Sequence, residues 1–287
     1  MERDHYLAII GILIIIAIAA FGGVKNPHRG LFYPGDPIKQ PQKSQIEEKI
    51  KEVERQIKNL ETEKNKSVFS EKVSIGYVNR STDPSQEYIT IQMKGQVPEQ
   101  IYLTGWTVKS TSSGASVTIP KATYLFFTGM LNSEEGIYLE NGDTMYLVTG
   151  ISPNGASFKL NKCSGYLEQF QNFVPYINSN CPLPRNEDLS SIPNRVINDA
   201  CFDYIDSFPS CRIETNTLPA NWSHECTTFI STKINYGSCI NTHKGDSDFY
   251  QHEWRVYLRR NASLWKMNRE NIVLYDNLGK IVDSITY

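Results

Sequence analysis

The feature that most constrains this chain is an apolar run near its start. Tyr6–Val24 contains no charged residue, and its centre consists almost entirely of Ile, Leu and Ala. As a helix rising about 1.5 Å per residue, this run would be about 28 Å long, close to the ~30 Å hydrocarbon core of a bilayer. We therefore predict a transmembrane helix over residues 6–24, preceded by a short tail of residues 1–5.

A cleaved signal peptide is the alternative for this run, because Ala17-Ile18-Ala19 fits a small-x-small cleavage site. The run is long for the apolar part of a signal peptide, which favours an uncleaved, single-pass anchor. Basic residues lie after the run as well as before it, so the flanking charges do not orient it.

The cysteines provide the orientation that the charges do not. All six lie between residues 163 and 239: Cys163, Cys181, Cys201, Cys211, Cys226 and Cys239. An even, clustered set behind an export signal indicates a disulfide framework, which forms in an oxidising compartment. We therefore expect the C-terminal part to be extracytoplasmic. Pairing sequence neighbours would give Cys163–Cys181, Cys201–Cys211 and Cys226–Cys239, but six cysteines allow many connectivities and the pairing stays open.

Between the apolar run and the cysteines, the sequence first predicts a linker and a helix. Four prolines punctuate residues 25–42, which favours an irregular or extended spacer. Residues 43–66 then carry apolar side chains at spacings of 4, 3, 4 and 3, with charged residues between them. This is the a/d seam of a short coiled coil, predicted as a stalk that self-associates. The alternatives are a seam that lies on the globular domain and a helix that stands alone. The seam consists of Ile46, Ile50, Val53, Ile57 and Leu60.

From residue 71 onward the pattern changes to short alternating runs, which indicate β-strands. Many short strands without alternating helices favour a mainly β, sandwich-like fold. Asn277 and Gly279 supply the turn of a closing hairpin. The predicted strands cover residues 73–78, 87–92, 101–108, 115–119, 123–127, 144–148, 157–160, 271–275 and 280–285.

Three of these pieces resemble the lamin tail domain family, including its bacterial surface members. They are Glu87-Tyr88-Ile89-Thr90-Ile91, Leu103-Thr104-Gly105-Trp106, and the closing run from Ile272 to Asp283. The resemblance covers residues 71–160 and 254–287 and implies an immunoglobulin-like β-sandwich over 71–287. A cysteine-rich insert at about 163–250 departs from the family pattern, so the family's partners do not transfer directly.

The insert is predicted to be a disulfide-tied helical cap. Pro193–Phe208 shows an apolar face at helical spacing, made by Val196, Ile197, Ala200, Cys201, Tyr204 and Ile205. Ser223–Tyr236 reads as a second helix that ends at Gly237. Trp222, between the two helices, is a candidate binding residue, and sealing the cap against the sandwich is the alternative role.

Candidate chemistry in the insert is sparse. His224, Cys226, Cys239, His243 and His252 include both zinc-ligand types, but no C-x-x-C pair occurs. Asp246 and Asp248 suit calcium, although solvated carboxylates are the commoner arrangement. No phosphate-binding glycine loop, G-x-S-x-G or H-E-x-x-H motif is present, so we predict neither cofactor, metal site nor catalytic residues.

The sequence therefore favours a membrane-anchored binding or structural module without catalytic activity, for an unidentified protein or glycan ligand. A formal net charge of −2 provides no basic footprint for nucleic acid. The alternative is an exported hydrolase or nuclease-associated protein with its site in the cysteine-rich insert.

Overall fold

The structure, a computed structural model, describes residues 43–95, 97–193 and 197–287. The predicted anchor Tyr6–Val24, the tail 1–5 and the linker 25–42 lie outside these residues. In the part that is described, no helix is long and apolar enough to cross a bilayer. The chain divides into two compact units, 1–59 and 60–287, with the boundary inside helix α2.

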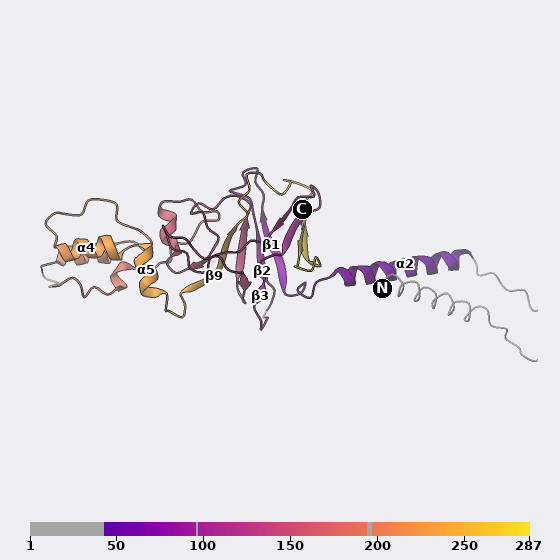
Figure 1. The fold of residues 1–287 in the computed structure, drawn as a ribbon, viewed down its shortest axis with the longest axis horizontal. Helices are drawn as coiled ribbons and strands as arrows, with labels where there is room; N and C mark the ends of the chain where they lie inside the picture. Colours follow the sequence, from indigo (N-terminus) through magenta and orange to yellow (C-terminus); the bar gives the residue numbers. More distant parts are fainter. Residues whose placement is uncertain (1–42, 96, 194–196) are drawn as a thin grey trace, which may run out of the picture. The chain divides into compact units, whose positions relative to one another are not determined.

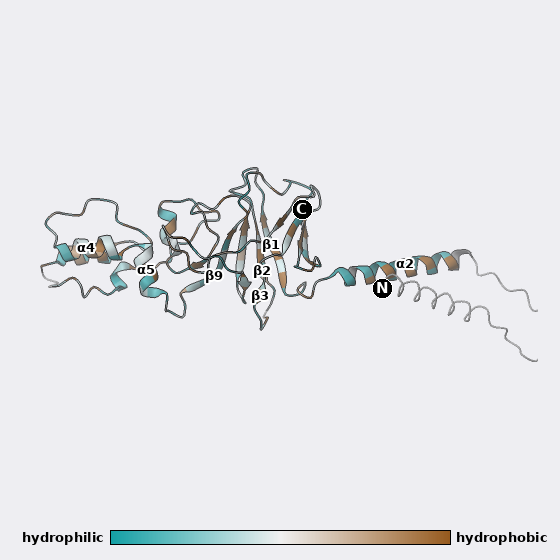
Figure 2. Ribbon diagram, in the orientation of Figure 1, coloured by the Kyte–Doolittle hydropathy of each residue, from teal (hydrophilic) through white to brown (hydrophobic). Residues whose placement is uncertain are grey.

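Helix α2 (Lys43–Asn65) confirms the helix predicted for the stalk. Its seam side chains from Ile46 to Leu60 are exposed, by between 44% at Ile46 and 70% at Leu60. Hydrophobic and hydrophilic residues alternate along it (Figure 2). The predicted apolar stripe is therefore present and accessible in the single chain.

The remaining unit is rich in β-strands, and its described strands form three sheets. The largest has the order β1-β2-β7-β9-β8, the second β11-β10-β4-β5, and the smallest pairs β3 with β6. Pairing is antiparallel except between β7 and β9. The strands are β1 (Val73–Asn79), β2 (Tyr88–Met93), β3 (Ile101–Tyr102), β4 (Thr107–Ser110), β5 (Ser116–Thr118), β6 (Tyr138–Leu139), β7 (Thr144–Val148), β8 (Phe158–Asn161), β9 (Tyr250–Tyr257), β10 (Asn271–Tyr275) and β11 (Ile281–Thr286).

The two larger sheets share one hydrophobic core. Alternate residues of β2, β7 and β9 meet alternate residues of β4, β5 and β10 in a single buried cluster. Trp106 is 1% exposed and Trp254 is 0% exposed in this cluster, so both are core residues. Because side chains alternate across a strand, the same strands leave a second face pointing away from this core.

The closing hairpin pairs with strands that precede the cysteines, as its apolar residues require. β10 lies between β11 and β4, with Val273 opposite Lys109 and Leu274 opposite Val108. The turn is held by Asp276, whose carboxylate accepts hydrogen bonds from Leu278 N, Lys280 N and Ser67 Oγ. Gly279 supplies the positive φ of +73° that the turn needs. The β unit is therefore one domain interrupted by the cysteine-rich segment.

Two strand predictions need correction, and one long strand was missed. Residues 101–108 are not one strand, because Gly105 adopts a φ of +91° and the chain turns between β3 and β4. Residues 123–127 form only an isolated bridge, between Thr123 and Phe158. Strand β9 was not predicted at all, although it joins β7 to β8.

The cysteine-rich segment extends from one end of the strands (Figure 1). It packs around a second hydrophobic core, which also includes Val148, Phe158, Leu160 and Tyr257 of β7, β8 and β9. It contains the 3₁₀ turns η1 (Ser164–Gln169) and η2 (Pro184–Asn186) and the helices α3 (Asp199–Ser207), α4 (His224–Lys233) and α5 (Tyr236–His243). All six cysteines are paired, as Cys163–Cys239, Cys181–Cys211 and Cys201–Cys226. The predicted disulfide framework is confirmed, whereas the pairing of sequence neighbours is wrong.

The predicted helix boundaries are also corrected. Helix α3 begins at Asp199, so Ile197 and Ala200 are exposed rather than part of an apolar face, and Val196 lies outside the described residues. Its buried face is Cys201, Phe202 and Ile205. The second helix ends at Lys233, because the Asn235 side chain accepts a hydrogen bond from Ser238 N and starts α5. Gly237 therefore lies inside a helix and does not end one.

Candidate functional site

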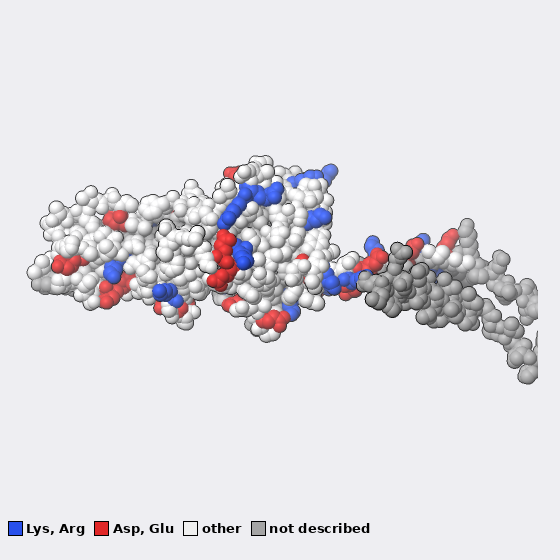
Figure 3. Space-filling model, viewed as in Figure 1, with Lys and Arg blue, Asp and Glu red and all other residues white. Residues whose placement is uncertain are grey.

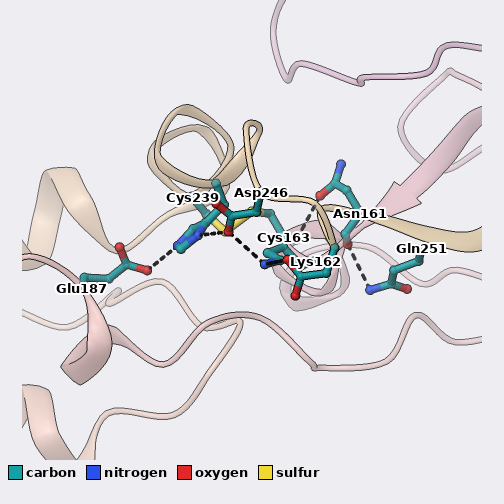
Figure 4. A network of polar contacts seen from close by, with 9 residues as sticks. Asn161, Lys162, Cys163, Glu187, Cys239, Asp246 and Gln251 are labelled. Carbon is teal, nitrogen blue, oxygen red and sulfur yellow. Dashed lines mark hydrogen bonds and ion pairs between the residues drawn. A yellow bond between two sulfur atoms is a disulfide. The ribbon is translucent and has the colours of Figure 1, made fainter.

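A disulfide and a polar network lie at the base of the cysteine-rich segment, where it joins the strands (Figure 4). Cys163 follows β8, and Cys239 lies in α5, shortly before the chain enters β9. Beside this bridge, His243 Nδ1 lies 2.8 Å from Asp246 and Nε2 lies 2.9 Å from Glu187. Lys162 Nζ lies 2.9 Å from the same Asp246 oxygen and also pairs with Asp248.

The network favours the charged form of His243. Burial acts to lower the pKa of His243, but its hydrogen bonds with Glu187 and Asp246 outweigh this, so the pKa is raised. The Lys162 ammonium and His243 in turn lower the pKa of Asp246. Because the folded-state pKa of His243 lies above that of the unfolded chain, its contribution is complete below the unfolded pKa of about 6.5 and is lost as pH rises through the folded value.

We therefore expect the wild-type protein to melt at a higher temperature at pH 5.5 than at pH 8, with part of this difference removed by His243→Gln. Thermal melts of both proteins at the two pH values test this. His252→Gln is the matched control, because His252 also lies beside a carboxylate, with Nδ1 2.8 Å from Asp143, but it lies on β9 and outside this network. An unchanged pH dependence in His243→Gln would contradict the role given to this network.

The structure separates the residues considered as metal ligands. Cys226 and Cys239 are consumed in disulfides, and His224, His243 and His252 contact Thr228, Glu187 and Asp143, respectively. Asp246 and Asp248, considered for calcium, instead bind the Lys162 ammonium. Within the described residues, no group of three or more His, Cys, Asp or Glu is placed to hold a metal ion.

Trp222 is half-buried, and its ring lies 5.1 Å from the ring of Tyr204, edge to face, so it packs against the hydrophobic core of the cysteine-rich segment. Tyr204 is held in turn by Glu214. Trp222 therefore helps to order the segment and offers only part of its ring to a ligand.

A more accessible aromatic surface lies on the outer face of the five-stranded sheet. Tyr77, Tyr88 and Tyr146, which we call the tyrosine face, lie on β1, β2 and β7. Their rings are 6.1 Å apart between Tyr77 and Tyr88 and 5.6 Å apart between Tyr88 and Tyr146. Tyr77 is 57% exposed, and the other two are half-buried. These rings present apolar area together with hydroxyl groups, a combination typical of binding surfaces.

Arg255 on β9 links this face to the cysteine-rich segment. It is 2% exposed, stands opposite Tyr146, and its guanidinium carbon lies 4.4 Å from the Tyr146 ring centre. Its Nη2 donates to the carbonyl of Tyr176 and pairs with Glu253, whose pKa is raised because burial outweighs the effect of Arg255. The Tyr146 ring is thus held in place by a buried cation.

The same region contains buried polar atoms with unused hydrogen-bonding capacity. Nε and Nη1 of Arg255 and the hydroxyl of Tyr257 have no hydrogen-bond partner within the described protein. Burial raises the pKa of Tyr257, so this hydroxyl is protonated at neutral pH. Glu168, whose pKa is raised by burial despite backbone hydrogen bonds from Ile177 and Phe173, fixes the loop that carries Tyr176.

The sequence analysis did not predict the tyrosine face, although the sequence indicates the outward position of two of its members. Tyr88 alternates with the core residues Ile89 and Ile91, and Tyr146 lies between Met145 and Leu147. Alternation alone places these tyrosines on an outer face. Only the strand order, with β2 beside β7 and β7 beside β9, brings them together with Arg255.

Comparisons with family models, with curated proteins and with solved structures gave no match.

Proposed function

We propose that this protein is an extracytoplasmic binding module without catalytic activity, whose ligand docks on the tyrosine face. The observation that carries the proposal is the row of adjoining tyrosine rings, partly exposed and backed by the buried Arg255. The loop whose Tyr176 carbonyl accepts a hydrogen bond from Arg255 also exposes the Tyr176 side chain. Ordered aromatic side chains lose little conformational freedom on binding, which favours affinity.

The disulfides support the proposed location. Three bridges and no free cysteine among the described residues suit an oxidising compartment. We propose that Tyr6–Val24 anchors the chain in the membrane as a single pass and that α2 serves as a stalk for the β unit. N-terminal sequencing of the mature chain distinguishes this anchor from a cleaved signal peptide.

The proposed fold class is an immunoglobulin-like β-sandwich of the lamin-tail type. Two sheets with a shared core support it, as does the pairing of the closing strand β10 with β4, which directly follows Gly105-Trp106. The competing hydrolase proposal relied on the cysteine-rich segment, where every cysteine is now committed to a disulfide and is no candidate nucleophile.

Photo-crosslinking on intact cells tests the binding proposal. A benzophenone amino acid placed at Tyr77, in the full chain, should form a covalent adduct with the ligand, whether protein or glycan. We expect Tyr88→Ala to reduce the yield of this adduct at least tenfold, because Tyr88 is the ring that joins Tyr77 to Tyr146.

The chain offers a matched control for this experiment. Tyr102 and Tyr138 are another pair of neighbouring tyrosines, each 40% exposed with ring centres 5.0 Å apart, on the small sheet β3-β6. The probe at Tyr102 should give no specific adduct, and Tyr138→Ala should leave the adduct at Tyr77 unchanged. Equal yields from the two tyrosine pairs would rule out the tyrosine face as the binding surface.

A further inference from the structure

The seam of α2 is an apolar stripe that the single chain leaves uncovered. Its five side chains are Ile46, Ile50, Val53, Ile57 and Leu60, and each is between 44% and 70% exposed. If Ile50 and Ile57 are assigned to position a of a heptad, Ile46, Val53 and Leu60 fall at position d. Lys43 and Lys64 occupy the next a positions at either end and so limit the stripe.

The charges beside the stripe are not symmetric. Position e holds glutamate in every heptad, at Glu47, Glu54 and Glu61. Position g instead changes from Lys49 through Gln56 to Glu63. In a coiled coil these two positions flank the seam and decide partner choice and orientation.

From this pattern we infer that the occupant of the stripe is a second copy of the same chain, packed parallel and in register. In that arrangement each g residue faces the e residue of the next heptad in the partner, so Lys49 meets Glu54 and Gln56 meets Glu61, with no like-charge pair. An antiparallel pair would bring Lys49 near Glu63, but it would also set the e glutamates against one another. Charge complementarity therefore selects the parallel orientation.

The inference goes one step beyond the proposed stalk, because it fixes the partner, the orientation and the register. It rests on the proposed function only where a shared membrane anchor raises the local concentration of two parallel stalks. Such help matters because the stripe spans little more than two heptads, which is short for an isolated coiled coil. A parallel pair would present two tyrosine faces from one point of attachment.

Cysteine crosslinking of the full chain in its host membrane tests orientation and register together. Same-numbered d positions face each other in a parallel, in-register pair, so Val53→Cys and Leu60→Cys should each give a covalent dimer on mild oxidation. Arg55→Cys, at the outward position f, is the matched control, and its dimer should form at least tenfold more slowly. An antiparallel pair would instead link Val53→Cys to Ile57→Cys in a co-expressed partner, which would overturn the inference.

A charge exchange provides a readout that does not depend on added cysteines. Glu54→Lys places two lysines at both contacts between positions 49 and 54 and should weaken association measured by sedimentation in detergent. Lys49→Glu combined with Glu54→Lys should restore association. Equal crosslinking at Arg55 and Val53, or no effect of the charge exchange, would show that α2 has another occupant, such as the bilayer surface. Neither result would bear on ligand binding at the tyrosine face, whose crosslinking from Tyr77 is scored separately.

Discussion

Truncation after Glu270 should unfold the whole β unit rather than only loosen its tail. The deletion removes β11 together with β10, which lies between β11 and β4. Ile272 and Leu274 are fully buried in the shared core, and Val282 is 3% exposed. Burying each such side chain contributes about 1.5–3 kcal/mol, so their combined loss is comparable to the whole stability of about 5–15 kcal/mol of a typical domain.

The expected result is a truncated chain without cooperative thermal melting and without native near-ultraviolet dichroism. Two point substitutions provide a graded version. Leu274→Ala should cost about 2–5 kcal/mol because it leaves a cavity in the core. Ile281→Ala, on the neighbouring strand but 39% exposed, should cost about 0.5 kcal/mol or little more. A cooperative melt after truncation would mean that the sheets close without the hairpin.

This hairpin was predictable because its signals are local. Asn277 and Gly279 mark the turn, and the apolar residues of β10 need a partner sheet, since a two-stranded hairpin alone is marginal in water. The seam of α2 was predictable because its spacing depends only on helix geometry.

Strand β9 and the disulfide pairing were not predictable, because both depend on contacts between distant parts of the chain. β9 carries the polar residues Gln251, His252 and Glu253 near its start and has Arg255 between its core residues Trp254 and Val256. It is therefore recognisable as a strand only once its neighbours are known. Arg255 is buried because Tyr146 and the carbonyl of Tyr176 surround it, and both belong to distant parts of the chain. Sequence spacing likewise places Cys163 beside Cys181, whereas folding returns α5 to the end of β8 and pairs Cys163 with Cys239.

The bridge between Cys163 and Cys239 should be the most stabilising of the three, and its loss should act mainly on the cysteine-rich segment. It closes a sequence separation of 76 residues, against 30 and 25 for the other two bridges. On the chain-entropy model, such a loop corresponds to about 4 kcal/mol, roughly 1 kcal/mol more than the shortest of the three. Both half-cystines are also buried in the core of the segment.

Amide hydrogen exchange of the double variant Cys163→Ala/Cys239→Ala shows which regions lose stability when this bridge is removed. The core that the two larger sheets share contains no cysteine, whereas the second core contains all six. Amides of α3, α4 and α5 should therefore lose protection, while those of β4 and β10, which contribute buried residues only to the first core, keep it. Cys201→Ala/Cys226→Ala is the matched control and should lower protection less, because its loop is shorter. Equal loss of protection in the helices and in β10 would contradict this expectation. It would show that the two cores unfold as one unit and that the sheets depend on a bridge outside their own strands.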